Sequence, residues 1–69
     1  ESSPLPKIIE QLPPYYKKLL NAYYYENSST KQLAEYFECS LSKIKIDLYR
    51  ARKKLKKQLE KAGYDQWLL

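Results

Sequence analysis

The sequence predicts an all-α, compact four-helix domain. Apolar side chains recur at three- and four-residue spacing in separate segments, which is typical of helices with one buried face. Serine residues suited to capping a helix stand ahead of two of these segments. No run alternates between apolar and polar residues as a half-buried strand does. A chain of 69 residues allows one small domain, and we expect a linker remnant at 1–4, the folded domain at 5–62 and a tail at 63–69.

Prolines separate the first two predicted helices. Pro6 suits the first turn of a short helix, whose apolar residues are Ile8, Ile9 and Leu12. Pro13 and Pro14 then end that helix, because proline offers no backbone N–H. A second helix is expected over 14–25, with an apolar stripe formed by Tyr16, Leu19, Leu20, Tyr23 and Tyr24.

A third, short helix is expected to begin at Thr30. Ser29 and Gln32 have the spacing of a capping box, in which each side chain bonds to the backbone N–H of the other residue. The inward residues of this helix are predicted to be Leu33, Ala34 and Phe37, with Tyr36 beside them.

The last helix is predicted to be long and to have two distinct faces. Ser40 is a suitable N-cap, and the helix runs to about Ala62, after which Gly63 supplies a C′ residue. The predicted inward stripe consists of Leu41, Ile44, Leu48, Ala51, Leu55 and Leu59. At about 100° per residue, the opposite side carries Ser42, Ile46, Tyr49, Arg50, Lys53 and Lys57, flanked by Lys45 and Lys56.

The positive charge of the chain is concentrated in this last helix. Nine basic and two acidic residues lie between positions 43 and 61, whereas the rest of the chain has four basic and six acidic residues. Such a segment indicates an anionic partner such as nucleic acid, with a merely solvated helix face as the alternative. A short capped helix followed by a long basic one is the outline of a helix-turn-helix, whose second helix enters the DNA major groove. We therefore expect DNA binding by Ser42, Lys43, Lys45, Ile46, Tyr49, Arg50, Lys53 and Lys57.

Three blocks of the sequence carry a family resemblance: residues 12–17 (LPPYYK), 29–34 (STKQLA) and 42–53 (SKIKIDLYRARK). Together they resemble region 4 of bacterial RNA polymerase sigma factors of the sigma-70 family, particularly the extracytoplasmic-function group. The first block resembles the Leu-Pro-Pro opening of that group, the second its capped helix and the third its recognition helix. The blocks align without gaps over 12–55, and their joint spacing is more specific than any block alone.

This resemblance implies recognition of the promoter −35 element by the last helix and docking on the flap of the polymerase β subunit. It also implies an anti-sigma factor as a further partner. By position, family members touch DNA at Lys45, Ile46, Tyr49 and Arg50. Because a sigma factor also needs a region that melts promoter DNA, we expect either a C-terminal domain of a longer factor or a stand-alone homologue.

The sequence departs from the family pattern at four positions. Ile46 replaces a small polar residue, and Tyr23 stands where some members have a phosphate-contacting arginine. Glu38 stands where a turn glycine is common. Asp47 replaces a usual arginine, and helical spacing offers it Lys43 or Arg50 as a partner. These departures leave the preferred DNA sequence open.

Other functions have less support in the sequence. The chain has no histidine and one cysteine, Cys39, so we expect no metal, cofactor, small-molecule substrate or catalysis, and a half-buried filler role for the thiol. No apolar run is long enough for a membrane span, and a free cysteine suits the reducing cytoplasm. Two alternatives remain: a protein-interaction module and a LuxR-type DNA-binding regulator. Protein docking is predicted for Tyr15, Tyr16, Tyr24 and Trp67.

Overall fold

Four helices make up the regular structure of the chain. The computed structural model describes residues 5–64. The helices are α1 (Leu5–Ile9), α2 (Pro14–Tyr24), α3 (Thr30–Tyr36) and α4 (Leu41–Lys61). Between residues 5 and 64 there is no strand, so the all-α prediction is confirmed. The predicted linker 1–4 and residues 65–69 of the predicted tail lie outside the described residues.

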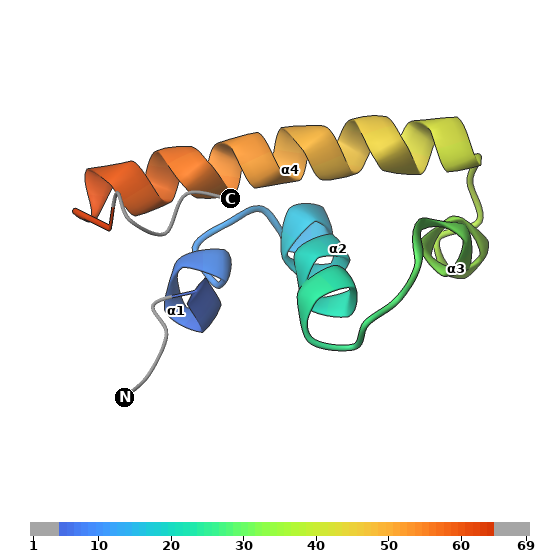
Figure 1. Cartoon of the computed structure of the whole chain (residues 1–69), viewed down its shortest axis with the longest axis horizontal. Helices are drawn as coiled ribbons and strands as arrows, with labels where there is room; N and C mark the ends of the chain where they lie inside the picture. Colours follow the sequence, from blue (N-terminus) through green and yellow to red (C-terminus); the bar gives the residue numbers. More distant parts are fainter. Residues whose placement is uncertain (1–4, 65–69) are drawn as a thin grey trace.

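Helix α4 packs against all three of the other helices. It runs along one side of the molecule, and α1, α2 and α3 follow one another beneath it from its C-terminal end to its N-terminal end (Figure 1). Helix α2 lies in the middle and also contacts both α1 and α3. Each short helix therefore buries its apolar side mainly against α4, which serves as the common support of the fold.

The helix boundaries follow from local hydrogen bonds. The Ser29 hydroxyl accepts the Gln32 N–H at 3.1 Å, and the Gln32 side-chain oxygen accepts the Ser29 N–H at 2.8 Å, which confirms the capping box. The Ser40 hydroxyl accepts the N–H of Lys43 at 3.1 Å at the start of α4. Beyond the last turn of α4, Gly63 has φ +86°, a left-handed conformation that glycine adopts without a steric penalty.

The core lies between α4 and the three short helices. Its largest fully buried side chains are Ile9, Leu19, Leu20, Leu33, Ile44, Leu55 and Leu59. Five of the six predicted inward residues of α4 are buried, but the prediction for Leu41 is wrong, because this side chain is 42% exposed. Leu41 is the first residue of α4 and lies at the edge of the apolar stripe, where α3 covers it only in part. Tyr36 is likewise exposed, and its ring meets that of Phe37 edge-on at 4.8 Å.

A four-residue turn sets the position of α4 relative to α3. Phe37 ends α3, and Glu38 takes φ +55°, the left-handed conformation for which the family pattern favours glycine. The Cys39 N–H then donates to the Ala34 carbonyl at 2.9 Å, which closes the end of α3. The Cys39 side chain is half-buried against the core, as predicted.

Candidate nucleic-acid interface

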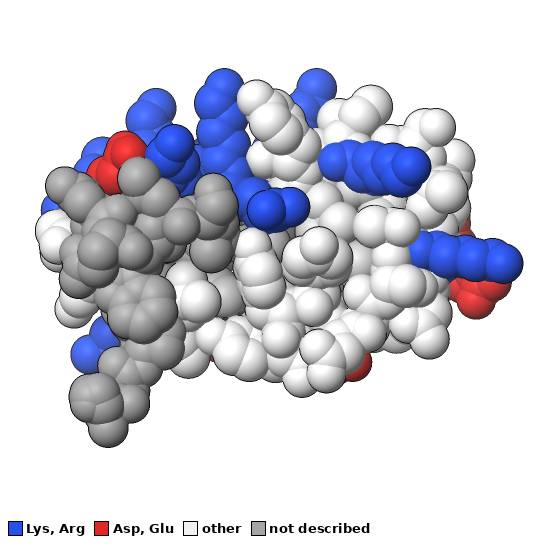
Figure 2. Space-filling model, viewed as in Figure 1, with Lys and Arg blue, Asp and Glu red and all other residues white. Residues whose placement is uncertain are grey.

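The outward face of α4 is exposed along its whole length. All eight residues predicted to bind DNA are exposed, including Ile46 at 51% and Tyr49 at 66%. In the space-filling view, lysine and arginine side chains gather along the side of the molecule formed by α4, whereas the surface below it is largely uncharged (Figure 2). The structure thus brings the predicted residues together on one protruding, positively charged helix.

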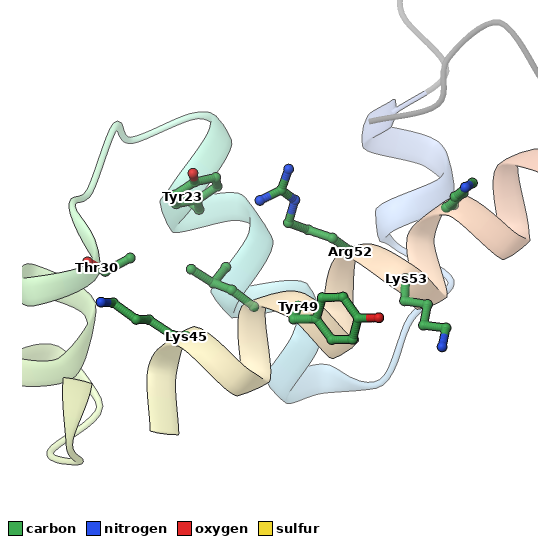
Figure 3. A pocket seen from close by; sticks show the side chains of 8 residues that line it. Tyr23, Thr30, Lys45, Tyr49, Arg52 and Lys53 are labelled. Atoms are coloured by element: carbon green, nitrogen blue, oxygen red, sulfur yellow. The ribbon is translucent and has the colours of Figure 1, made fainter. Parts of the chain in front are cut away.

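One edge of this face borders a depression of about 500 Å³ between α2, α3 and α4. Lys45 extends toward Thr30 at the start of α3, and Arg52 extends from α4 toward Tyr23 of α2 (Figure 3). Lys56 also lines this depression. Cations facing hydroxyl groups in an open, shallow recess suit a phosphate group better than an apolar ligand.

The opposite edge of α4 carries a second row of cations. At about 100° per residue, Arg50, Lys54 and Lys57 share this edge, and they line a second depression together with Tyr16 and Glu60. Lys53 and Lys56 line both depressions, which therefore adjoin toward the C-terminal half of α4. The most protruding positions, Ile46, Tyr49 and Lys53, lie between the two edges. A helix in the major groove has a sugar-phosphate strand on each side, so cations on both edges and mixed side chains between them match that geometry.

A buried carboxylate lies within this otherwise cationic helix. Asp47 Oδ2 accepts a hydrogen bond from the Tyr15 hydroxyl of α2 at 2.6 Å and another from Lys43 Nζ at 2.6 Å. The Lys43 ammonium also lies 5.2 Å from the centre of the Tyr15 ring. Helical spacing offered Asp47 either Lys43 or Arg50 as a partner. In the structure Asp47 pairs with Lys43, and it also bonds to Tyr15, which is 32 residues away in the sequence. We refer to Tyr15, Lys43 and Asp47 as the Asp47 cluster.

The Asp47 cluster changes the acidity of its members. Burial by itself favours the neutral acid of Asp47, but the hydrogen bonds from Lys43 and Tyr15 outweigh it and lower the pKa of Asp47. Burial and the bond to Asp47 raise the pKa of Tyr15 to about 12. The bond to Asp47 also raises the pKa of Lys43. At neutral pH the cluster therefore holds an aspartate, an ammonium and a neutral phenol.

The Tyr15 pKa gives a prediction for alkaline unfolding. A pKa that is higher in the folded state stabilises the fold fully below the unfolded value, near 10, and this stabilisation is lost as the pH rises through about 12. Tyr15→Phe lacks this contribution, so we expect the stability advantage of the parent protein over the variant to shrink from pH 10 to pH 12. Urea unfolding of both proteins across this range measures it. An advantage that stays constant or grows would contradict the raised pKa of Tyr15, which burial and the bond to Asp47 produce together.

The tyrosines predicted to dock proteins are partly engaged within the fold. The Tyr15 hydroxyl bonds to Asp47, and Tyr16 is half-buried beside the second depression. The Tyr24 ring meets Tyr23 edge-on at 5.2 Å. The Tyr24 hydroxyl is buried, and this burial raises its pKa against the opposing charge of Arg52. Trp67 lies outside the described residues.

The comparisons with known proteins identify the family of the chain. A family model described as sigma-70, region 4, matches residues 3–55, which is more than half of the sequence. The chain belongs to the sigma-70 region 4 family. Searches of curated proteins and of solved structures gave no significant match. The predicted resemblance to sigma factor region 4 is therefore confirmed.

Membership assigns this region 4 domain to a group of DNA-binding, non-catalytic domains of transcription. The match includes the helix-turn-helix of α3 and the first two-thirds of α4, and it ends before Lys57. Among residues 5–64, no helix combines the length and apolar character that crossing a membrane requires.

Two residues of the candidate interface were not among the predicted site residues. Arg52 and Lys56 of the region 4 domain line the first depression together with Lys45. Arg52 and Lys56 follow Lys45 by seven and eleven residues, which places all three on one edge of α4. Helical periodicity could therefore have identified Arg52 and Lys56 as site residues. The sequence singled out Tyr15 only as a docking residue, and it did not predict the bond from Tyr15 to Asp47, because this bond depends on how α2 packs against α4.

Proposed function

We propose that this region 4 domain recognises the promoter −35 element with the outward face of α4. The observation that carries the proposal is the cationic row on each edge of a protruding helix, in a domain whose family binds DNA. The residues proposed to face DNA are Ser42, Lys45, Ile46, Tyr49, Arg50, Lys53 and Lys57, with Arg52 and Lys56 added. Of the eight predicted residues, Lys43 is left out of the proposal because its ammonium bonds to Asp47.

Different parts of α4 suit different contacts with DNA. The first two turns present Ser42, Ile46 and Tyr49, of which Ile46 and Tyr49 can make apolar contact with thymine methyl groups. Arg52 and the lysines from Lys53 onward follow toward the C-terminal end, where they suit phosphates. Arg50 lies between these groups and carries the donor fork that recognises guanine or phosphate.

We also propose that the domain docks on the β flap of RNA polymerase, and that an anti-sigma factor covers part of its surface. The region 4 family supports a polymerase partner. Binding of DNA by the outward face of α4 leaves α2 and α3 available for proteins, and Tyr25 and Tyr36 at the C-terminal ends of these two helices are exposed. Both partners place the proposed action in the cytoplasm.

Selection of bound duplexes from a random library, followed by titrations at several salt concentrations, tests the proposal. We expect enrichment of one sequence motif and a decrease of log K with log salt that corresponds to several phosphate contacts. Binding that does not depend on salt would instead favour the protein-docking module.

Arg50→Ala is expected to weaken binding to the selected duplex by about 1–3 kcal/mol, and to weaken binding to random DNA by less. An equal loss on both duplexes would assign Arg50 to a phosphate.

A further inference from the structure

The Asp47 cluster lies at the N-terminal end of one cationic row of α4. At about 100° per residue, Lys43 shares its edge of the helix with Arg50, Lys54 and Lys57. From its position in the sequence, Lys43 would extend that row by two turns toward the first bases read. The Lys43 ammonium instead bonds to Asp47 Oδ2 at 2.6 Å, on the side of the helix that packs against α2.

The carboxylate of Asp47 is a fixed partner for Lys43. Its side chain is 11% exposed, and the Tyr15 hydroxyl of α2 holds it from the other side. Moving Lys43 to a phosphate would leave a poorly hydrated anion with one hydrogen bond, which is costly. The π-face of the Tyr15 ring, 5.2 Å from the Lys43 ammonium, further favours the present position.

Lys45 provides the contrast within the same helical turn. Lys45 is exposed, as Lys43 is, but it has no ion pair within residues 5–64, and it lines the depression on the other edge of α4. The two lysines differ by two positions in the sequence, but only Lys43 has a buried carboxylate within reach.

We propose that Asp47 is a positioning residue that keeps Lys43 away from DNA, so that the cationic row on this edge of α4 begins at Arg50. The bond from Tyr15 fixes Asp47 for this role. The first two turns of α4 are thereby left with Lys45 as the one cation that has no ion pair among residues 5–64, and with the uncharged side chains proposed to meet base edges. This arrangement reduces sequence-independent attraction where bases are read. The inference rests on the proposed binding of DNA by the outward face of α4.

Salt titrations on a random-sequence duplex test this proposal with four proteins. Each phosphate contact changes the slope of log K against log salt by about 0.9. Lys45→Gln should make the slope shallower by about 0.9 relative to the parent. Asp47→Asn should release Lys43, so binding tightens and the slope steepens by about 0.9. The double variant Asp47→Asn with Lys43→Gln has the parent's net charge and should return to the parent's slope.

The pattern of outcomes separates this proposal from the proposed function. An unchanged slope in Lys45→Gln would overturn DNA binding by this face, and the inference with it. A normal effect of Lys45→Gln together with equal slopes for Asp47→Asn and the double variant would overturn the inference alone. A double variant with a shallower slope than the parent would also overturn it, because Lys43 would then contact phosphate in the parent protein.

A measurement on the unaltered chain does not depend on whether the variants fold. Lysine acylation read by mass spectrometry, with and without the duplex, compares the individual amines. We expect DNA to protect Lys45 and Lys53 and to leave the acylation rate of Lys43 unchanged. Protection of Lys43 equal to that of Lys45 would overturn the proposal.

Discussion

Leu55→Ala is expected to lower the free energy of unfolding by about 2–5 kcal/mol. Leu55 is fully buried in the inward face of α4, beneath which the three short helices pack. A domain of this length has a total stability of about 3–10 kcal/mol, so the variant should lose much or all of its folded population at 37 °C. Urea titration followed by far-UV circular dichroism measures the change.

Leu41→Ala provides the matched control, since it removes the same atoms from the same helix. Leu41 is 42% exposed, so its truncation should cost less than about 0.5 kcal/mol. Similar losses for the two variants would contradict the packing of α4, and a larger loss at Leu41 would place the start of the helix inside the core.

The double variant Lys45→Gln with Lys53→Gln is expected to bind DNA about 30-fold more weakly at 0.15 M salt, because two phosphate contacts are lost. Lys45 lies on the edge of α4 that borders the first depression, and Lys53 lies on its most protruding face. The slope of log K against log salt should become shallower by about 1.8, by equal amounts on selected and random duplexes. Fluorescence anisotropy at several salt concentrations provides both values.

The control for this variant removes the same charge elsewhere. Lys7 of α1 and Lys18 of α2 are exposed and lie away from the outward face of α4. Changing both to glutamine should leave the slope nearly unchanged. If this control weakens binding as much as the α4 variant does, then net charge and not the face of α4 governs the attraction to DNA.

The sequence predicted most of the fold because the helix boundaries depend on local chemistry. The capping box of Ser29 and Gln32 and the cap at Ser40 need only residues within one turn, and both form as predicted. Pro14 begins α2 for an equally local reason, but the prediction that the two prolines end the first helix is wrong, because α1 already ends at Ile9 and Leu12 lies in the turn after it. The outward face of α4 follows in turn from helical periodicity and the distribution of charge.

The parts that the sequence did not predict depend on which helix covers which surface. Periodicity placed Leu41 on the apolar side of α4, but it does not show that α3 leaves the first residue of the helix partly uncovered. Periodicity likewise offered both Lys43 and Arg50 to Asp47. In the structure the Asp47 carboxylate bonds to both Lys43 and Tyr15. The bond to Tyr15 depends on the packing of α2 against α4, which helical periodicity does not describe.

The division of α4 into two faces has a consequence for how DNA preference could diverge among descendants of this chain. Its buried side holds the fold together, while the opposite side bears the exposed groups that we propose to face DNA. Because Ser42, Ile46 and Tyr49 contribute little to the core, we expect that exchanging them changes the proposed recognition without compensating changes inside the protein. New specificities can therefore arise through single substitutions, each passing through a folded intermediate.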